Sequence, residues 1–332
     1  MMNNFEFPDI SHALPTLANN LLDYGAEVGS RDGDGRSSVL ELTWVRTTLD
    51  NPYRREVLLR ERKANIFAQI AETMWVLSGR SDVDWLERYL PRARQFSDDG
   101  IVWRGGYVPR IRHWDGTDQV QNVISLLRED RTTRRAVIQI YDPARDSAPG
   151  KDIPCNNWIA MNSRLGNLDM GVALRSNDLV WGWSGINAFE WSVLQEIIAF
   201  ELGIRQGSLS FFTASLHSYN RHWGRLGRIS RDYPVSELAE VKDSPRYAPA
   251  KRDTWSSLIN QFMEAEEYIR TSGDDPVVIA DKISKFPEPM YRSWLHALNL
   301  YWHGQPLPEY LANTRLGVAT RISKQFIKKE GI

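Results

Sequence analysis

The sequence has almost no cysteine, no long apolar run and no excess of charge of one sign. Its 332 residues include one cysteine, which cannot form an internal disulfide or a cysteine-based metal site. No run of about 18 uncharged apolar residues occurs, so no membrane-spanning helix is expected. Lys and Arg number 41 against 42 Asp and Glu, which argues against broad electrostatic binding to nucleic acid. The first residues lack the basic and apolar regions of a secretory signal, and we therefore expect a cytoplasmic location.

The patterns along the chain predict one α+β domain over residues 1–332, with a central mixed or antiparallel sheet flanked by helices. Strand patterns cover 39–45, 135–141 and 209–215, of which 135–141 is expected to be buried, and a hairpin joins 158–162 to 168–174. Helical patterns cover 64–77 and 187–202, and residues from 254 onward are mostly helical. Turn formers dominate 29–38, a Trp- and Gly-rich loop is expected at 181–185, and 323–332 is expected to be a polar tail. The helix at 187–202 is nearly all apolar, which predicts a central position.

The lone cysteine is the first candidate for chemistry. Cys155 follows Pro154 at the edge of a predicted strand, where a side chain can face a cleft. A lone cysteine is often a small buried hydrophobe. A nucleophilic role requires a lowered pKa and therefore a nearby cation, and Arg175 is within reach across the hairpin.

Several arginines are candidates for binding phosphate. In Arg175-Ser176-Asn177-Asp178 a guanidinium and a hydroxyl lie together, which suits a phosphate, although a surface turn with a salt bridge fits the pattern equally well. Arg31, in its glycine-rich loop, and the pair Arg134-Arg135 are further candidates, and each alone also fits a solvated charge.

Three other side chains have patterns that allow a functional role. His217 and Tyr219 lie two residues apart on extended backbone and face the same way, so both could bind sugar hydroxyls; a core histidine is the alternative. His217 and His222 lack matching carboxylate or cysteine spacing, so no metal site is expected. Glu72 lies nearly opposite the apolar stripe of its helix, which favours a solvated side chain, but Ala68 and Trp75 leave room for a partly buried carboxylate that moves protons.

Taken in chain order, these segments resemble the thymidylate synthase and pyrimidine nucleotide hydroxymethylase family, most strongly over residues 29–223. Ile153-Pro154-Cys155-Asn156 resembles the family's nucleophile segment, and Arg175-Ser176-Asn177-Asp178 its Arg-Ser-x-Asp. Six further segments resemble family motifs in the expected order: Arg31–Gly35, Ala71–Gly79, Gly106–Trp114, Arg134-Arg135, Asn187 and Leu216–Asn220.

The resemblance implies that the Cys155 thiolate adds to C6 of a pyrimidine nucleoside monophosphate, so that C5 can attack the one-carbon unit of 5,10-methylenetetrahydrofolate. It also implies a homodimer, because the family's paired arginines reach in from the other subunit. For the nucleotide, the implied roles are lowering of the thiol pKa and phosphate binding by Arg175, phosphate binding by Arg31, Arg134, Arg135 and Ser176, base reading by Asn187, and sugar binding by His217 and Tyr219. The implied cofactor-binding residues are Asp178, which would hold the pterin, and Trp114, which also lines the cavity. Glu72 would transfer protons through water, and Tyr107 would line the cavity near the C5 proton.

Departures from the family pattern bear on the product, which is a methyl group after hydride transfer or a hydroxymethyl group after water addition. Asn156 stands where thymidylate synthases usually carry His, residues 181–187 replace the usual loop near the base, and 328–332 do not resemble the apolar tail that closes over folate. A less sealed cavity favours water. We therefore predict a nucleotide 5-hydroxymethylase, with CMP or dCMP favoured over uridylate, although Asn187 is typical of uridylate enzymes.

Three alternatives remain open from the sequence. One is a thymidylate synthase, one a dUMP hydroxymethylase, and one a nucleotide-binding protein without catalysis. The third is disfavoured because a pure binder needs none of Cys155, Glu72 and Tyr107. The sequence does not distinguish ribose from deoxyribose.

Overall fold

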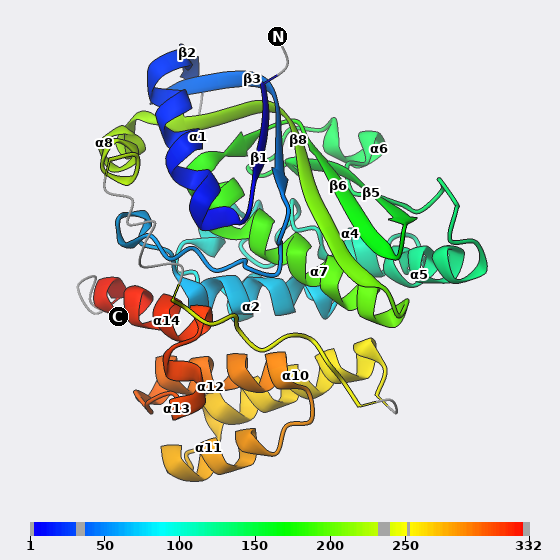
Figure 1. The fold of residues 1–332 in the computed structure, drawn as a ribbon, viewed down its shortest axis with the longest axis vertical. Helices are drawn as coiled ribbons and strands as arrows, with labels where there is room; N and C mark the ends of the chain where they lie inside the picture. Colours follow the sequence, from blue (N-terminus) through cyan, green and yellow to red (C-terminus); the bar gives the residue numbers. More distant parts are fainter. Residues whose placement is uncertain (1–2, 31–36, 232–239, 251–252, 328–332) are drawn as a thin grey trace.

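The structure is a computed structural model that describes residues 3–30, 37–231, 240–250 and 253–327 (Figure 1). The predicted phosphate residue Arg31 lies outside these residues. No helix in the described ranges is long and apolar enough to cross a membrane.

A mixed sheet forms the upper half of the molecule in Figure 1, as the sequence predicted. Its main path is β1-β3-β8-β6-β5-β4, with β2 paired to β3 and β7 to β8. Two of the pairs on the main path, β1 with β3 and β6 with β8, are parallel, and the others on that path are antiparallel. The strands are β1 (Asn3–Phe7), β2 (Ala26–Ser30), β3 (Ser37–Leu49), β4 (Val137–Gln139), β5 (Asn156–Arg164), β6 (Asn167–Leu174), β7 (Asn177–Asp178) and β8 (Arg205–Tyr219).

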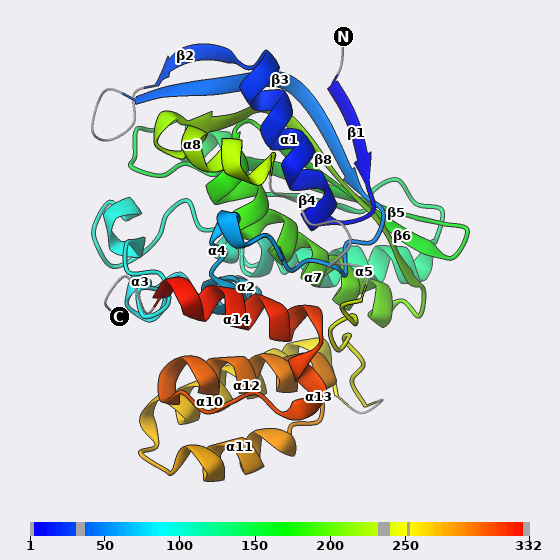
Figure 2. The same ribbon diagram turned by 60° about the vertical axis from the view of Figure 1, so that its left-hand side comes forward.

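Helices cover one face of this sheet and form the lower half of the molecule (Figures 1 and 2). Helices α1 and α7 pack on the strands, α2 packs against α7, and α10, α11 and α12 form a layer below α2. The helices are α1 (Ile10–Tyr24), α2 (Ile66–Leu77), α3 (Val83–Leu86), α4 (Val108–Arg112), α5 (Gln119–Glu129), α6 (Pro143–Asp146), α7 (Ala188–Glu201), α8 (Asn220–Ile229), α10 (Trp255–Thr271), α11 (Pro276–Ser284), α12 (Pro289–His303), α13 (Glu309–Ala312) and α14 (Arg315–Ile327), with short turns η1 (Arg60–Arg62) and η2 (Ala93–Phe96) and a π-helical segment η3 (Leu179–Asn187).

The elements that position the site form where the sequence patterns predict them. Residues 188–199 of α7 are all buried, as expected of a helix that is apolar on every side, and the helix is followed by Gly203 in the left-handed region with φ of 64°. The hairpin β5–β6 turns at Leu165 and Gly166, both with positive φ, which matches the twist of the strands. Helix α2 begins at Ile66, two residues after the predicted start.

Three local predictions were wrong. Residues 181–185 are not a loop but part of η3, which runs directly into α7. Residues 137–139 form an edge strand rather than a buried one, because β4 pairs only with β5 and exposes Val137. The start of the predicted polar tail belongs to α14, where the buried Ser323 hydroxyl donates to the carbonyl of Ala64 at 2.7 Å.

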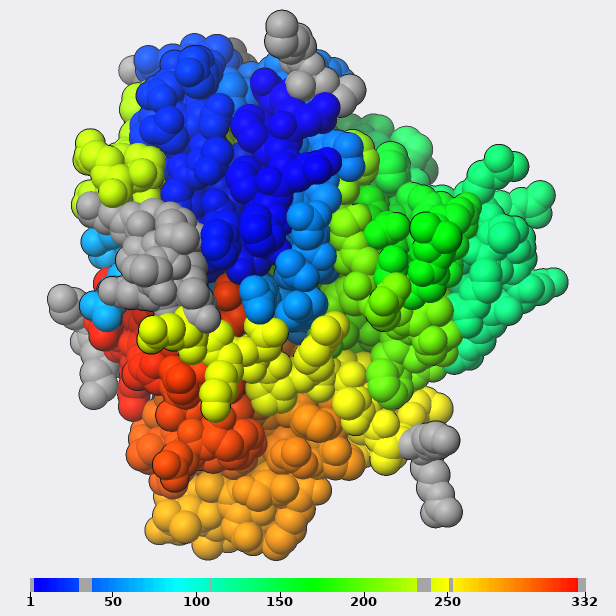
Figure 3. All heavy atoms as spheres, viewed as in Figure 1, coloured from blue at the N-terminus to red at the C-terminus, as the bar shows by residue number. Residues whose placement is uncertain are grey.

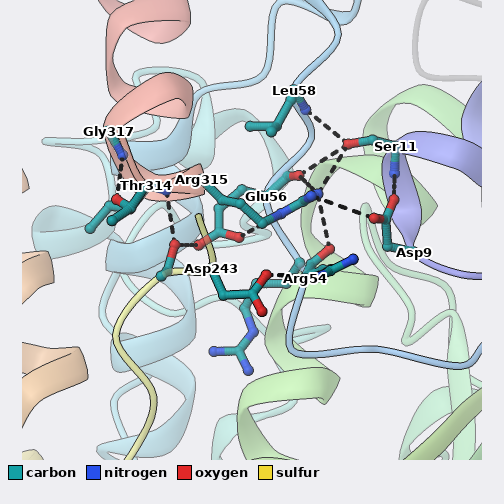
Figure 4. Close-up of polar contacts among 12 residues, drawn as sticks. Asp9, Ser11, Arg54, Glu56, Leu58, Asp243, Thr314, Arg315 and Gly317 are labelled. Atoms are coloured by element: carbon teal, nitrogen blue, oxygen red, sulfur yellow. Dashed lines mark hydrogen bonds and ion pairs between the residues drawn. The ribbon is translucent and has the colours of Figure 1, made fainter. Parts of the chain in front are cut away.

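A buried arginine joins the C-terminal helix α14 to the start of α1 and to the segment between β3 and η1 (Figure 4). The Arg315 guanidinium lies 3.4 Å from Asp9 Oδ2 and 3.6 Å from Glu56 Oε2, and it donates to the Glu56 carbonyl at 3.1 Å. All three side chains are nearly inaccessible. Segments from opposite ends of the chain are therefore held together, and Figure 3 shows the N-terminal (blue) and C-terminal (red and orange) parts packed with the yellow segment around residue 245 between them. The division of the chain into one domain stays a prediction.

Candidate active site

Cys155 lies immediately before β5 with its side chain partly exposed. The Arg175 guanidinium wraps the same loop: its Nε donates to the Pro154 carbonyl at 3.0 Å and its Nη2 to the Ile153 carbonyl at 2.7 Å. The backbone N–H of Arg175 also donates to the Cys155 carbonyl at 2.9 Å. The hairpin thus places the cation beside the thiol, as the sequence predicted.

The electrostatic balance at the thiol differs from the prediction. Burial raises the pKa of Cys155 above its usual value, and the positive charge of Arg175 lowers it only in part. The carboxylate of Asp152 acts in the same direction as burial. Without a bound nucleotide, the Cys155 thiol therefore does not have the lowered pKa that was expected, because the loop that presents the thiol also buries it.

Tyr107 and Asn156 line the same site. Tyr107, at the start of α4, packs its ring against Trp191 with 5.4 Å between ring centroids. Trp191 in turn donates its Nε1–H to Asn156 Oδ1 at 3.2 Å. Burial, then the charges of Cys155 and Glu190, raise the pKa of Tyr107, which places its hydroxyl near both groups and keeps it protonated.

Three carboxyl groups surround this position. Glu72, on α2, is partly buried, and burial together with Asp152 raises its pKa to about 8. Asp152 accepts a hydrogen bond from the Trp103 indole, and burial raises its pKa too. Glu190, on α7, is 1% exposed, and its pKa lies well above the usual value because of burial and then Glu72. The structure thus supports the partly buried Glu72 over the solvated alternative.

The side chain of Asn187 is oriented by a hydrogen bond to Asn177, which lies two residues after Arg175. The Asn187 Nδ2 donates to Asn177 Oδ1 at 3.2 Å, and both side chains are buried. Gly182 allows this pairing, because a Cβ there would lie under 3.0 Å from Asn177 Oδ1. No other side-chain hydrogen bond of Asn187 is found within the described ranges. Ser176, beside Arg175, is half-buried.

The strand pair β7–β8 brings Asp178 and His217 together, since the two residues are directly opposite in the register. Asp178 Oδ1 accepts from the backbone N–H of Val180 at 2.6 Å and also from that of Trp181, whereas its Oδ2 is buried without a partner among the described residues. His217 packs edge-on against Tyr219 with ring centroids 5.3 Å apart, which confirms that the two side chains face the same way.

Aromatic rings form a wall next to Asp152 that sequence reasoning did not assign. Phe96 stacks on Trp103 at 5.6 Å with an interplanar angle of 10°, and Trp181 lies 6.3 Å from Phe96. Trp181 is 48% exposed, so part of this wall is open to a ligand. A flat, aromatic molecule fits such a surface.

Other predicted residues lie apart from these groups. Arg134 and Arg135 are exposed just before the edge strand β4, and no side-chain hydrogen bond or ion pair is found for either in the described part of the chain. Trp114 packs against two guanidinium groups, those of Arg110 at 4.8 Å and Arg145 at 3.9 Å, rather than against any of the site residues above. Its role in binding the cofactor stays a prediction.

Two alternative kinds of site receive little support. Among the described residues, no group of three or more His, Cys, Asp or Glu side chains is arranged to hold a metal ion. A hollow of about 560 Å³ lies between α3 and α10 and contains no residue of the Cys155 site; its walls carry charges of both signs, including Arg80, Asp84, Arg88 and Glu267. The chemistry of the side chains, rather than the size of the hollow, identifies the Cys155 site.

Comparisons with known proteins agree with this arrangement. The model of a protein family described as thymidylate synthase matches residues 13–246. The chain is 38% identical to the deoxyuridylate hydroxymethyltransferase of Bacillus phage SP01 over 75% of this chain and 73% of the relative, and 37% identical to that of Pseudomonas phage M6 over 86% and 79%. It is 40% identical to the deoxyuridylate hydroxymethyltransferase of Delftia phage PhiW-14 over 56% of this chain, a match that spans about half of that relative (55%).

Proposed function

The chain belongs to the thymidylate synthase family, and we propose that within this family it is a nucleotide 5-hydroxymethylase whose substrate is dUMP. Membership makes it a one-carbon transferase that acts at C5 of a pyrimidine nucleotide, with 5,10-methylenetetrahydrofolate as the donor. The product and the base are the parts of the proposal that require argument.

The residues present fit the folate donor. The unpartnered Asp178 Oδ2 can accept an N–H of the pterin, and the half-exposed face of Trp181 can cover an aromatic ring. When bound, the donor supplies carbon at the oxidation level of formaldehyde. The protein's part is to hold this carbon next to C5 of the pyrimidine.

Cys155 begins the chemistry by covalent addition. Its Sγ would bond to C6, which raises the electron density at C5 and lets C5 attack the donated carbon. Arg175 favours the thiolate form and opposes the effect of burial on the pKa of Cys155. We assign removal of the C5 proton to the Tyr107 hydroxyl, a role supported by its proximity to Cys155. After tetrahydrofolate departs, C5 carries an exocyclic methylene group.

We propose that water, rather than hydride, is added to this methylene group. The observation that supports water addition is the likeness to three phage hydroxymethyltransferases, two of which are matched over most of both chains. The site chemistry supports it. The partly buried Glu72 carboxyl group, whose pKa is raised by burial and by Asp152, can hold a water molecule beside the catalytic groups. Water addition leaves tetrahydrofolate unoxidised, whereas hydride transfer yields dihydrofolate.

The geometry of Asn187 supports uracil over cytosine. With one N–H bonded to Asn177, the amide presents its other N–H and its Oδ1, a donor and an acceptor that match O4 and N3–H of uracil. Cytosine needs the reverse arrangement at N3 and N4, and therefore a flipped amide. The preference for CMP or dCMP stated from the sequence remains an untested prediction, and the same assay decides it.

We also propose a homodimer formed through the open face of the sheet. Trp158 on β5, Ala173 on β6 and Phe212 on β8 occupy one cross-strand row. Trp158 is 38% and Phe212 42% exposed, and Trp44 on β3 is 70% exposed, so large apolar groups on several strands meet water. A second copy covering this face would bury them and bring its Arg134 and Arg135 toward the phosphate. Phe212→Asp should then shift the molecular mass measured by light scattering from dimer to monomer.

One experiment tests the proposed reaction. The enzyme is incubated with 5,10-methylenetetrahydrofolate and CMP, dCMP, UMP or dUMP, and the products are identified by mass. We expect 5-hydroxymethyl-dUMP together with tetrahydrofolate. A methyl product with dihydrofolate would establish a thymidylate synthase instead. If 5-tritiated dUMP and dCMP release no tritium with the donor present, the chain is a nucleotide-binding protein without this catalysis.

A further inference from the structure

A carboxyl group that the reaction outlined above does not require lies buried within the site. Glu190 is the third residue of α7, a helix that is buried from Ala188 to Ala199 and whose other buried side chains are mostly apolar or aromatic. Its side chain is 1% exposed, and neither oxygen has a hydrogen-bond partner among the described residues. Buried carboxyl oxygens are nearly always paired, because an unpaired one costs about 1–3 kcal/mol. Such a residue in an apolar helix therefore calls for a functional explanation.

The groups around Glu190 come from three segments. Glu72 faces it from α2, Tyr107 from the start of α4, and the loop that carries Asp152 and Cys155 completes the surroundings. The mutual effects of these groups on their pKa values show that they share one region: Glu72 raises the pKa of Glu190, and Glu190 raises that of Tyr107. In the described part of the chain no direct hydrogen bond joins Glu72 to Glu190, and both Glu190 oxygens remain open to a bridging water.

The mutual repulsion of their charges limits how many of the two carboxyl groups, Glu72 and Glu190, can be ionised. Two neighbouring carboxyl groups in a poorly solvated site cannot both ionise without a large cost. Burial and then Asp152 raise the pKa of Glu72 to about 8, and burial and then Glu72 raise the pKa of Glu190 well above its usual value. We assign the proton that exchanges to Glu72, because Glu190 is the more deeply buried of the two side chains.

We infer that Glu190 is a neutral carboxylic acid that holds, together with Glu72, the water molecule that adds to the C5 methylene group. This role rests on the proposed hydroxymethylase function. In the step, the water oxygen forms a bond to the methylene carbon and gives a proton to the Glu72 carboxylate. The electron pair of the C=CH₂ bond passes through C5 to restore the C5–C6 double bond, and the C6–S bond breaks to release Cys155 as a thiolate. Nothing is oxidised or reduced.

The test separates this step from those before it. Enzyme in excess is mixed with 5-tritiated dUMP and the folate donor, and both tritium release and hydroxymethyl formation are followed over a single turnover. Tritium leaves before water adds. In Glu190→Gln, which keeps shape and neutrality but replaces the acid group that holds the water by an amide, we expect tritium release within about threefold of wild type and hydroxymethyl formation at least tenfold slower. Glu190→Asp, which keeps the acid, should form product faster than Glu190→Gln.

Controls make each outcome decisive. Glu201→Gln removes a carboxyl from the surface end of the same helix, where it pairs with Arg128, and should leave both rates unchanged. Equal loss of both rates in Glu190→Gln, or wild-type rates for both, would overturn the inference, as would a Glu190→Asp variant no faster than Glu190→Gln. If the wild-type enzyme makes no hydroxymethyl product, the proposed function itself is refuted. The wild-type reaction therefore tests the function, and the comparison of variants tests the role of Glu190.

Discussion

The pairing of Asn187 with Asn177 can be tested at Gly182, which has no side chain of its own and lies against Asn177. In Gly182→Ala the new Cβ would lie under 3.0 Å from Asn177 Oδ1, so that side chain must move. Asn177 is 2% exposed and packed, and its movement breaks the 3.2 Å hydrogen bond that orients Asn187. A net hydrogen bond contributes about 0.5–1.5 kcal/mol, so the KM for dUMP should rise roughly 2- to 10-fold with kcat less affected.

A matched glycine provides the control. Gly224 lies inside α8, where the nearest atom to an added Cβ is Arg228 Nη1 at 3.9 Å. Gly224→Ala should leave the kinetic constants unchanged and stabilise the protein by about 0.5–1 kcal/mol, because alanine loses less freedom in a helix.

A double mutant identifies the cause. If Gly182→Ala acts by displacing Asn177, it should have little effect in an Asn177→Ala background, since the clashing oxygen is gone. The further change in KM should then correspond to a free energy of less than about 0.5 kcal/mol. Wild-type KM values for both single variants, or fully additive losses in the double variant, would refute the proposed orientation of Asn187.

Three further predictions concern other parts of the molecule. Cys155→Ser should abolish turnover yet keep nucleotide binding, measured by calorimetry, within about tenfold or ~1.4 kcal/mol; substantial turnover would exclude covalent catalysis. Because the pKa of Glu72 is raised to about 8, the folded protein holds a proton there that the unfolded chain loses above about pH 4.5, so stability falls as pH rises to 8. The Tm of Glu72→Gln relative to wild type should therefore rise between pH 5 and pH 8, and a constant difference contradicts the assignment. Arg315→Ala leaves Asp9 and Glu56 buried without their cation and should lower the free energy of unfolding by about 3–5 kcal/mol, or roughly 6–10 °C in Tm. Arg228→Ala, which breaks an exposed ion pair, should lower it by only about 0–1 kcal/mol. Equal losses in the two variants would show that the buried network contributes no more than a surface pair.

The sequence alone predicted the structure correctly where a pattern is local or where the order of the motifs is preserved. The alternation in 168–174 predicted β6, and the spacing of Cys155 and Arg175 across the hairpin predicted their proximity, which the contacts of the Arg175 guanidinium confirm. Local patterns were less informative about burial. The position of the cation was predictable, but the burial that raises the pKa of Cys155 depends on packing from several segments.

Other parts of the fold and site required the tertiary structure. Helix α1 went unassigned in the sequence, although Asp9 caps it, and it contains Pro15 in its interior. The Trp- and Gly-rich residues 181–185 form helix because Asp178 accepts hydrogen bonds at the start of η3. Glu190 did leave a signal, since carboxyl groups are unusual in a largely apolar stretch such as 188–199, but only the fold shows that Glu196 pairs with Arg55 while Glu190 faces Glu72.

The central claim is that Cys155 bonds to C6 of the pyrimidine, and a stalled adduct tests it most directly. With 5-fluoro-dUMP and 5,10-methylenetetrahydrofolate, fluorine replaces the proton that must leave C5, so the reaction should stop with the nucleotide attached to the enzyme. Peptide mass spectrometry should then find the nucleotide on the peptide that contains Cys155. A nucleotide bound tightly but released intact on denaturation, or attached to another residue, would contradict the claim.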